Sequence, residues 1–553
     1  MQNTPEPIFN KDIMFGAEAY SKLKNGIDKM ANAVRVTLGP KGRNVVVDKL
    51  WDSPIITNDG VSIAKEIKLK DRFENAGAQL LKQVAEKTNQ VAGDGTTTAI
   101  ILAHSMITEG LKMVTSGIDP MSIKRGMDSA KDTAVKELNG LRRIVNSKEE
   151  LSQVATISSE DPEAGKLIAD VMHKIGKDGI VTVEEGNTFG LESEMVNGLQ
   201  FEKGYSTPYM ITNHEKLEAE VKDPHILITD FKLSAIQEVV PLMENLSRHG
   251  KKDLVIIADQ ITGEAMATLI INKLKGMFNV LAIEAPGTGL RKKELLLDIC
   301  AVTGATLISE DTGQKVENAS LELLGRADRV VSTRFNTIIV GGKGQKEIID
   351  GRIKELTRAV ADQKNPAEQD YLKTRLAKIK GGVAIIKVGA ATEAEIVYKK
   401  MKLEDAINAT RAALEEGVVP GGGSAFITVY RNMLLGLTDK RVTDENIGRK
   451  ILMDALKEPF KQLVKNSGIE ESSTLMEYVI GNSNGGWDFR MTDPNDLNKG
   501  KVEDMFKHGI IDPLKVVRSG LENAVSVAGI FLTTECVLAN DQDDINRFEE
   551  HLK

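Results

Sequence analysis

Gly93-Asp94-Gly95-Thr96-Thr97-Thr98 stands immediately before an apolar segment with helical spacing, and this stretch decides how the chain is interpreted. Glycines let backbone amides approach an anion closely, and the N-terminus of a helix adds unpaired N–H donors and a favourable dipole. The three hydroxyls are further donors, and the carboxylate of Asp94 is a potential ligand for Mg²⁺ held between phosphates. The pattern indicates a nucleotide site without a Walker A motif. An ordinary threonine N-cap after a glycine turn uses the same residues, so the motif alone leaves both interpretations open.

Four further segments carry residues that suit the same chemistry. The turn Thr37-Leu38-Gly39-Pro40-Lys41-Gly42-Arg43-Asn44 can lie over phosphates, although such a sequence also marks plain surface turns. Asn58-Asp59-Gly60 has the sequence of a tight hairpin turn, in which the carboxylate would merely be solvated. Asp405 points away from the apolar stripe of its predicted helix, as a solvated carboxylate also does. Gly421-Gly422-Gly423 is either a connector or a close approach of backbone to a ligand.

Length and composition set broad limits. The 553 residues suggest two to four domains, and 41% hydrophobic with 27% charged residues is typical of a globular protein with sizeable cores. The net charge of -8 argues against a nucleic-acid partner. Two distant cysteines, Cys300 and Cys536, favour a reducing compartment. The first residues do not resemble a targeting segment, and no apolar run approaches the roughly 18 residues of a membrane span. We therefore expect a cytoplasmic protein with no membrane partner.

Hydrophobic periodicity changes along the chain. The first 140 residues or so and the part after Gly421 have mostly helical spacing, whereas the middle alternates helices with short apolar runs. The predicted strands of the middle part are Ile180–Glu184, His225–Thr229, Leu254–Ala258, Val280–Glu284, Thr306–Ser309 and Val383–Val388. A long helix is predicted over Glu393–Glu416. This order predicts one helical domain built from both chain ends, with an α/β domain inserted between them.

Several blocks together resemble the group I chaperonins, the bacterial GroEL type. The blocks are Thr37–Asn44, Asn58–Val61, Gly93–Thr98, Gly389–Glu393, Glu404–Ala406, Ala409–Gly417 and Pro420–Gly423. They occur in the family's order and at about its spacing, and the similarity extends from about Ile8 to Asn540. A group II chaperonin is a variant of this interpretation, because Thr57-Asn58-Asp59-Gly60 resembles that group locally. The apical stretch has no evident built-in lid, which favours group I.

The resemblance implies a multidomain chaperonin fold of mixed helices and sheets. Its parts are a mostly α-helical equatorial domain, a small intermediate domain and an inserted α/β apical domain. The expected boundaries are 1–140 and 416–553 for the equatorial domain, 141–196 and 383–415 for the intermediate domain, and 197–382 for the apical domain.

The resemblance also implies an ATPase whose residues carry over by position. Asp94 would ligate Mg²⁺, Asp405 would orient or activate the attacking water, and Asp59 would assist near the γ-phosphate. The implied phosphate-binding residues are Thr37, Leu38, Gly39, Pro40, Gly95, Thr96, Thr97 and Thr98. Gly422 and Asp512 would contact the ribose, and the backbone carbonyl of Asn58 would serve a K⁺ site.

For partners, the resemblance implies unfolded or misfolded client proteins, a single or double ring of seven subunits, and a GroES-type co-chaperonin. The implied client-binding residues are Tyr205, Tyr209, Met210, Val240, Met243, Met266, Ile270 and Ile271. The helical segment 264–274 is apolar on more than one side, which favours an exposed patch, whereas the stripe with Val240 and Met243 fits core packing equally well. Lys203 and Glu393 stand where the family pairs neighbouring subunits.

Two other functions are compatible with the residues. One is a ring that holds unfolded protein without productive ATP cycling, although Asp59, Asp94 and Asp405 are all present. The other is a soluble phosphotransferase acting on a small metabolite. Departures from the family pattern indicate a divergent member. They are Asn58 in place of lysine, Gly486-Trp487-Asp488-Phe489 at the adenine side, a longer segment between Asn482 and Val502, Gly287-Thr288-Gly289-Leu290 in the apical part, and a charged tail ending at Lys553.

Overall fold

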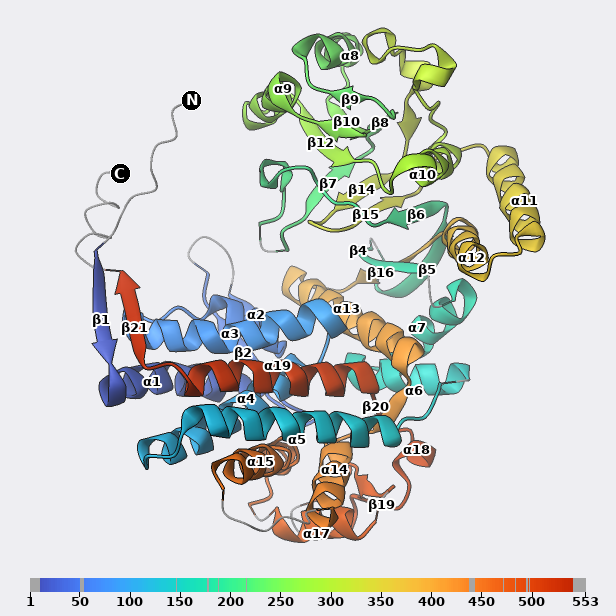
Figure 1. Cartoon of the computed structure of the whole chain (residues 1–553). Helices are drawn as coiled ribbons and strands as arrows, with labels where there is room; N and C mark the ends of the chain where they lie inside the picture. The colour runs from blue at the N-terminus through green and yellow to red at the C-terminus, as the bar shows by residue number, and fades with distance from the viewer. Residues whose placement is uncertain are drawn as a thin grey trace. The chain divides into compact units, whose positions relative to one another are not determined.

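The chain folds into two compact units, shown in a computed structural model (Figure 1). The model describes residues 10–49, 54–145, 147–176, 179–186, 188–214, 216–436, 443–470, 472–482, 484–493, 496 and 498–540, so the charged tail lies outside the described residues. The first unit comprises Met1–Asp170, Asn187–Gly190 and Val388–Lys553, and the second comprises Val171–Gly186 and Leu191–Lys387. The chain thus begins and ends in one unit and builds the other in between, which is the predicted nested order.

The first unit is mainly helical. Its helices are α1 (Gly16–Arg35), α2 (Gly60–Glu66), α3 (Arg72–Ala92), α4 (Thr96–Thr115), α5 (Pro120–Gly140), α6 (Lys148–Ser159), α13 (Glu393–Glu416), α14 (Ser424–Leu435), α15 (Asp444–Ala455), α16 (Glu458–Asn466), α17 (Ser473–Gly481), α18 (Met505–His508) and α19 (Leu514–Leu532). Its strands are β1 (Lys11–Phe15), β2 (Val45–Val47), β3 (Ile55–Thr57), β17 (Val418–Pro420), β18 (Gly486–Trp487), β19 (Lys501–Val502), β20 (Ile511–Pro513) and β21 (Cys536–Asn540). Helix α7 (Pro162–Ile175) leads into the second unit.

Five long helices of the first unit share one core. Helices α1, α3, α4, α5 and α19 lie side by side and contribute most of its buried side chains (Figure 1). Fully buried members include Ile27 on α1, Met106 on α4 and Phe531 on α19. Because α19 lies near the end of the chain and packs on α3, α4 and α5, the two chain ends are joined through this core.

Two of the small two-stranded ribbons of the first unit expose apolar side chains. β1 pairs antiparallel with β21, with Lys11 opposite Asn540, and β2 pairs antiparallel with β3. Each ribbon has only two strands, and each exposes large apolar side chains: Ile13, Phe15 and Leu538 on one, Val46 and Ile56 on the other. Open strand edges with apolar side chains are typical of surfaces that pair with another chain.

The second unit is built on three larger sheets and one two-stranded sheet. Its strands are β4 (Ile180–Glu185), β5 (Gly190–Val196), β6 (Gly198–Phe201), β7 (Ala219–Lys222), β8 (His225–Ile228), β9 (Lys232–Leu233), β10 (Asp253–Ala258), β11 (Gln260–Ile261), β12 (Asn279–Glu284), β13 (Gly325–Arg326), β14 (Arg329–Ser332), β15 (Thr337–Val340) and β16 (Val383–Gly389). Its helices are α8 (Ile236–Arg248), α9 (Gly263–Leu274), α10 (Gly289–Thr303), α11 (Lys346–Asp362) and α12 (Pro366–Gly381). The larger sheets have the orders β12-β10-β8-β13, β6-β15-β14-β7 and β4-β16-β5, and β11 pairs in parallel with β9.

The central sheet of this unit follows the predicted α/β pattern. β10 pairs in parallel with both β8 and β12, and the three strands are almost wholly buried, as expected for a parallel sheet covered by helices. The predicted strand Thr306–Ser309 is wrong: only Ile308 forms a bridge, to Thr229 at the end of β8. The neighbouring edge of β8 pairs instead with the short antiparallel strand β13.

A buried ionic network fixes α11 and α12 to α10. The carboxylate of Asp298 accepts hydrogen bonds from Nε of Arg352 at 2.8 Å, from Nε of Arg375 at 2.8 Å and from Nη2 of Arg375 at 3.0 Å. The side chains of Asp298 and Arg375 are each only 3% exposed. Two guanidinium groups thus satisfy one buried carboxylate, as a buried charge requires.

The structure divides into two compact units, whereas the sequence predicts three domains separated by four boundaries. The predicted boundaries at 140, 196, 382 and 415 therefore stay predictions.

No helix of the described residues is long and apolar enough to cross a membrane.

Candidate nucleotide site

The N-terminus of α4 is the structural centre of the candidate site. Its N-cap, Gly95, has left-handed backbone with φ 79°, a conformation that favours glycine, and no side chain makes a cap hydrogen bond there. The first bond of the helix runs from N of Ala99 to O of Gly95 at 3.1 Å. The backbone N–H groups of Thr96, Thr97 and Thr98 therefore have no partner within the helix and can donate to an anion.

Asp94 lies directly at this helix end. Its Oδ1 accepts a hydrogen bond from N of Gly95 at 2.5 Å, and its Oδ2 accepts one from Oγ of Ser158, on α6, at 3.0 Å. Burial raises the pKa of Asp94, and the nearby charge of Asp59 raises it further. The positive charge near this carboxylate is therefore too small to offset its burial and the charge of Asp59. A bound cation would relieve that deficit.

Asp59 and Gly60 lie against the same helix end. Asp59 is not at a hairpin tip: it is the N-cap of α2, and its carboxylate accepts hydrogen bonds from N of Val61 at 3.2 Å and N of Ser62 at 2.9 Å. A Cβ atom on Gly60 would lie 2.5 Å from Oγ1 of Thr97, so only glycine permits this approach. The packing brings the Asn58–Gly60 segment to the unpaired amides of α4.

The predicted phosphate turn is the third segment at this place. Oγ1 of Thr37 lies 3.4 Å from Oγ1 of Thr97. The carbonyl of Leu38 accepts a hydrogen bond from Nδ2 of Asn466, on α16, at 2.9 Å, and the turn continues through Gly39 to an exposed Pro40. Lys41, the next residue of this turn, donates a hydrogen bond to the carbonyl of Thr492 at 2.6 Å.

Helix α13 brings Asp405 to the other side of Asp94. A Cβ atom on Gly93 would lie 2.4 Å from Cβ of Asn408, so α13 packs directly on the turn that carries Asp94. Asp405 lies one helical turn before Asn408. Burial raises the pKa of Asp405 well above its ordinary value, and the charges of Asp59 and Asp94 raise it further. Three predicted carboxylates thus lie close enough to repel one another.

A lysine and a glutamate that the sequence analysis did not select join this cluster. Nζ of Lys402, on α13, lies 2.7 Å from Oε1 of Glu160, and Nδ2 of Asn58 donates to the same oxygen at 3.3 Å. Burial opposes the charge of Lys402, but Glu160, with smaller contributions from Tyr398 and Asp405, raises the pKa of the lysine. Lys402 and Glu160 are 242 positions apart, so no local pattern connects them.

Gly422 and Asp512 meet where β17 pairs with β20. Val419 lies opposite Asp512 in this ribbon, and Gly422 follows with left-handed backbone at φ 60°. The carboxylate of Asp512 accepts a hydrogen bond from the backbone of Gly422. Burial, with a contribution from the charge of Asp94, raises the pKa of Asp512 to about 7. The predicted ribose-side residues are therefore electrostatically linked to the predicted metal ligand.

The segment predicted to lie on the adenine side, Gly486 to Phe489, is buried. Trp487 and Phe489 are buried in a cluster with Phe460, and Nε1 of Trp487 donates to Oγ1 of Thr492 at 3.1 Å. Asp488 is buried and binds Arg490, with Nη2 of the arginine 2.9 Å from Oδ2. The aromatic residues that distinguish this chain from the family pattern thus serve as core. The longer segment up to Val502 folds back as the ribbon of β18 and β19.

The arrangement fits a nucleotide with Mg²⁺. Among the described residues, no group of three His, Cys, Asp or Glu side chains converges on one metal position. Mg²⁺ is commonly held by one or two carboxylates together with substrate phosphates and water. Asp94, underneath an uncapped helix N-terminus and beside two further carboxylates, supplies oxygen donors of that kind.

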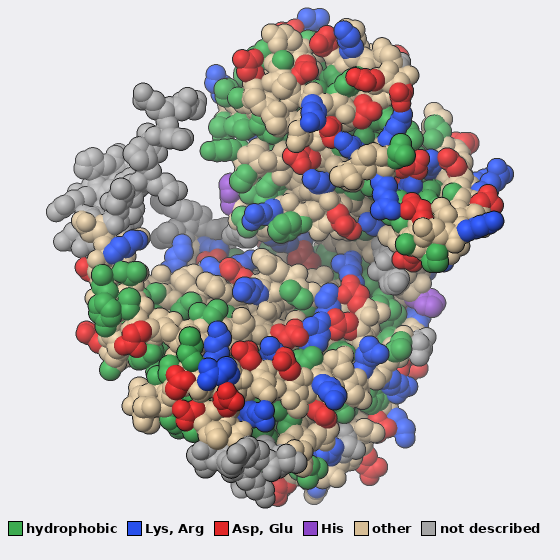
Figure 2. Space-filling view, viewed as in Figure 1, with side chains coloured by type: hydrophobic (Ala, Val, Ile, Leu, Met, Phe, Trp, Pro, Cys, Tyr) green, Lys and Arg blue, Asp and Glu red, His purple; other side chains and the backbone are tan. Residues whose placement is uncertain are grey.

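The predicted client-binding residues lie in the second unit, and they divide into two groups. On α9 only Ala265 and Leu269 are buried; Ile271 is 45% and Leu274 69% exposed, and Met266 and Ile270 are half-buried. Figure 2 shows hydrophobic side chains gathered over α9.

Outside α9, the remaining predicted residues differ in burial. Tyr209 is exposed, and Tyr205 and Val240 are half-buried. Met210 is buried in the core of the unit, and Met243 is buried there as well because α8 turns the stripe that carries it inward. These two methionines offer no surface to a client in this structure.

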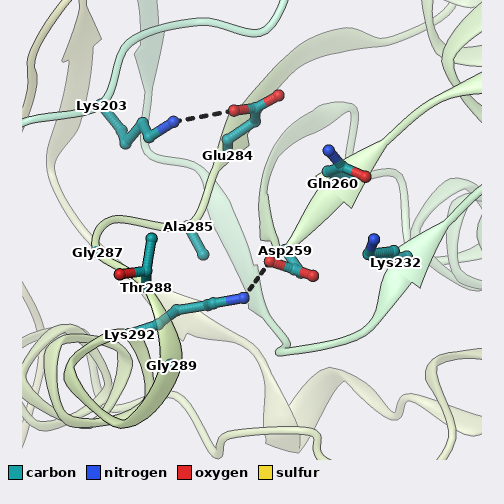
Figure 3. Close-up of a pocket in the computed structure, with 10 residues that line it drawn as sticks. All are labelled: Lys203, Lys232, Asp259, Gln260, Glu284, Ala285, Gly287, Thr288, Gly289 and Lys292. Atoms are coloured by element: carbon teal, nitrogen blue, oxygen red, sulfur yellow. Dashed lines mark hydrogen bonds and ion pairs between the residues drawn. The ribbon is translucent and has the colours of Figure 1, made fainter.

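A polar cavity of about 240 Å³ lies at the ends of β10 and β12 (Figure 3). Nζ of Lys203 lies 3.0 Å from Oε2 of Glu284, and Lys292 pairs with Asp259. The start of α10, with Gly287 and Gly289 both at positive φ, closes one side. Lys203, predicted to pair between subunits with Glu393, thus has a partner within its own unit; the predicted pairing stays a prediction.

Comparisons with known proteins agree with the residue blocks. A model of the TCP-1/cpn60 chaperonin family matches residues 30–542. Among solved structures, the chain is similar to the chaperonin gp146 from bacteriophage EL 2 (Pseudomonas aeruginosa), crystallised in the presence of ATP-BeFx. That match has a TM-score of 0.67 and 19% sequence identity, and it covers 96% of this chain and 99% of the other.

Proposed function

Because the chain belongs to the TCP-1/cpn60 chaperonin family and is an ATP-dependent chaperone with ATPase activity, we propose that it hydrolyses ATP at the N-terminus of α4. The observation that carries this proposal is the convergence of Asp59, Asp94 and Asp405 on that helix end. Phosphoryl transfer needs positioning and charge neutralisation more than covalent chemistry, and these residues supply both.

In this proposal, the amides and hydroxyls of 95–98 bind the phosphates, together with the turn from Thr37 to Pro40. Asp94 holds Mg²⁺, which when bound neutralises phosphate charge. The Asp405 carboxylate accepts a hydrogen bond from the attacking water and orients it, and Asp59 assists from the end of α2. Gly422 and Asp512 contact the ribose, and the carbonyl of Asn58 provides an oxygen ligand for K⁺.

The Asp405→Ala variant tests this mechanism. Removing a residue that positions or activates the nucleophile is expected to lower the hydrolysis rate by about 10²-fold or more, with nucleotide affinity largely retained. Single-turnover hydrolysis and equilibrium binding of ATP measure the two properties separately. Asp132→Ala, which removes an exposed carboxylate on α5, is the matched control. Unchanged hydrolysis in Asp405→Ala would refute the assigned role.

The α9 surface supports a proposal for client capture. Exposed Ile271 and Leu274, with Tyr209 and the half-buried Met266 and Ile270, provide an apolar patch that suits non-native proteins. Methionine adapts to varied partners because its side chain is flexible and polarisable. In the proposal, clients bind to this surface before they are enclosed.

The two open ribbons support a ring assembly. In the proposal, the β2–β3 ribbon of one subunit pairs with the β1–β21 ribbon of the next, which would cover the apolar side chains that both expose. Seven-membered rings in the cytoplasm, group I membership and a GroES-type co-chaperonin complete the proposal on the strength of the family resemblance. Native mass with and without ATP tests the assembly: a species of seven or fourteen subunits supports it, and a stable monomer under both conditions overturns it.

A further inference from the structure

The candidate site has a marked excess of negative charge. Asp59, Asp94 and Asp405 lie within electrostatic reach of one another, and a bound triphosphate would add more negative charge. Burial raises the pKa of both Asp94 and Asp405, and the charge of Lys402 opposes the rise at both positions. The charge of Lys402 therefore acts on the middle of the site.

The position of Lys402 ties it to Asp405. The two residues are three apart on α13 and so lie on the same face of the helix. The Lys402 side chain is only 16% exposed, whereas its partner Glu160 is 41% exposed. Asn58, directly before Asp59, is neutral and donates to the same oxygen of Glu160 that binds the lysine. The positive charge beside the three carboxylates thus comes from Lys402 on α13. The segment that carries Asp59 has the neutral Asn58 instead.

Glu160 can release the lysine at small energetic expense. It is the C-cap of α6, with left-handed backbone at φ 60°, and its partly exposed carboxylate can be solvated by water. An ion pair with one solvated partner contributes little to stability, whereas a lysine facing a buried multiply charged phosphate gains much more. The arrangement has the features of a switch between two anionic partners.

We propose that Lys402 senses the terminal phosphate of the nucleotide, exchanging Glu160 for the γ-phosphate when a triphosphate is bound. The inference rests on the proposed ATP site. It makes Lys402 a specificity residue that distinguishes a triphosphate from a diphosphate. It also means that the compensating charge and the water-orienting carboxylate are delivered by the same helix.

The competing explanation is a purely structural ion pair that links α6 to α13. The two explanations predict different signs for the change in nucleotide affinity when each partner is removed. Removing either partner of a structural pair would disturb nucleotide binding in the same direction. For a sensor, Lys402→Met should weaken triphosphate binding, and Glu160→Gln should strengthen it because the competing anion is gone.

The experiment is calorimetric titration of the full chain with Mg·ADP and with Mg·ADP plus beryllium fluoride, which mimics the γ-phosphate. Lys402→Met is expected to weaken binding of the mimic by about tenfold or more relative to ADP, as loss of a charged hydrogen bond implies. Lys402→Arg should retain most of the preference, and Glu160→Gln should bind the mimic more tightly than wild type.

Equal effects of Lys402→Met on both ligands would overturn the inference, and so would a change of the same sign in Glu160→Gln. Because Lys402→Arg and Glu160→Gln are conservative, they decide the matter even where Lys402→Met fails to fold. If wild-type protein binds neither ligand, the proposed ATP site itself is wrong, and this outcome is distinct from failure of the sensor.

Discussion

The Asp512→Asn variant should make the nucleotide-free protein more stable at alkaline pH. In the folded chain burial, with help from the charge of Asp94, raises the pKa of Asp512 from 3.8 to about 7. A difference of that size corresponds to about 4 kcal/mol at about 1.4 kcal/mol for each pH unit, which is an upper limit for the expense of ionising this group in the fold. Asparagine keeps an oxygen that can accept the hydrogen bond from Gly422 and carries no charge.

The sign of the pH dependence follows from proton binding. Between about pH 4 and pH 7 the folded protein retains a proton on Asp512 that the unfolded chain has lost, so stability of the wild type falls as pH rises through this window. Above about pH 7 Asp512 is ionised in the folded and the unfolded chain alike, and the folded wild type is destabilised by the full amount. Asp512→Asn should therefore match the wild type near pH 4 and exceed it at pH 8.

Thermal unfolding of nucleotide-free protein at pH 5 and pH 8 measures this effect as a change in Tm. A rise of a few degrees in Asp512→Asn at pH 8, much reduced at pH 5, is expected for a chain of this size. Asp132→Asn, at an exposed carboxylate, should show no such dependence. A Tm gain that is the same at both pH values, or a loss at pH 8, would refute the assignment of the destabilisation to the Asp512 charge. Because Asp512 is also proposed to contact the ribose, the variant should gain stability and lose nucleotide affinity together.

Two further predictions concern the second unit. Arg375→Met should destabilise this unit by about 3–5 kcal/mol, because the buried Asp298 loses its main partner. Urea denaturation followed by circular dichroism measures the loss, and the double variant with Asp298→Leu should recover much of it. A single variant as stable as the wild type would contradict the role of the ionic network. Ile271→Asp should leave unfolding within about 0.5 kcal/mol of wild type but abolish suppression of aggregation of a denatured client protein. Ile348→Asp, at an exposed position on α11, is its control, and equal loss of client capture in both variants would count against the α9 surface.

Helix and strand positions were predicted best where local signals agreed. The helix predicted over Glu393–Glu416 is confirmed to the residue as α13, because Thr392 caps its start and Gly417 stops it. Strands β8, β10 and β12 are mostly apolar and almost wholly buried, and their apolar runs predicted them. The run Thr306–Ser309 has apolar residues only at its centre, and only Ile308 forms a bridge, to Thr229 directly after β8, which pairs along this edge with β13. Pairing partners are set by tertiary structure, which no local pattern reports.

In the candidate site, too, local sequence predicted some residues, whereas others depend on tertiary packing. Asp94 was predicted because Gly-Asp-Gly-Thr before a helix has a physical meaning without knowledge of the fold. Asp405 required the family resemblance, because a carboxylate on a polar helix face is usually solvated. Lys402 and Glu160 escaped prediction because their meeting depends on how α6 and α13 pack. Met243 illustrates the reverse: a helical stripe has the same spacing whether core or surface lies beside it.

The helical core that both chain ends share affects how the protein folds during its own synthesis. The ribosome delivers α1, α3, α4 and α5 hundreds of residues before α19, which completes their common core, so these helices must wait with apolar faces uncovered. The second unit is contained almost wholly in one stretch of chain and can close first. Contacts between residues so far apart in sequence are slow to form, and exposed apolar surface promotes aggregation in the interval. A nascent subunit is thus itself a substrate of the kind that finished subunits bind.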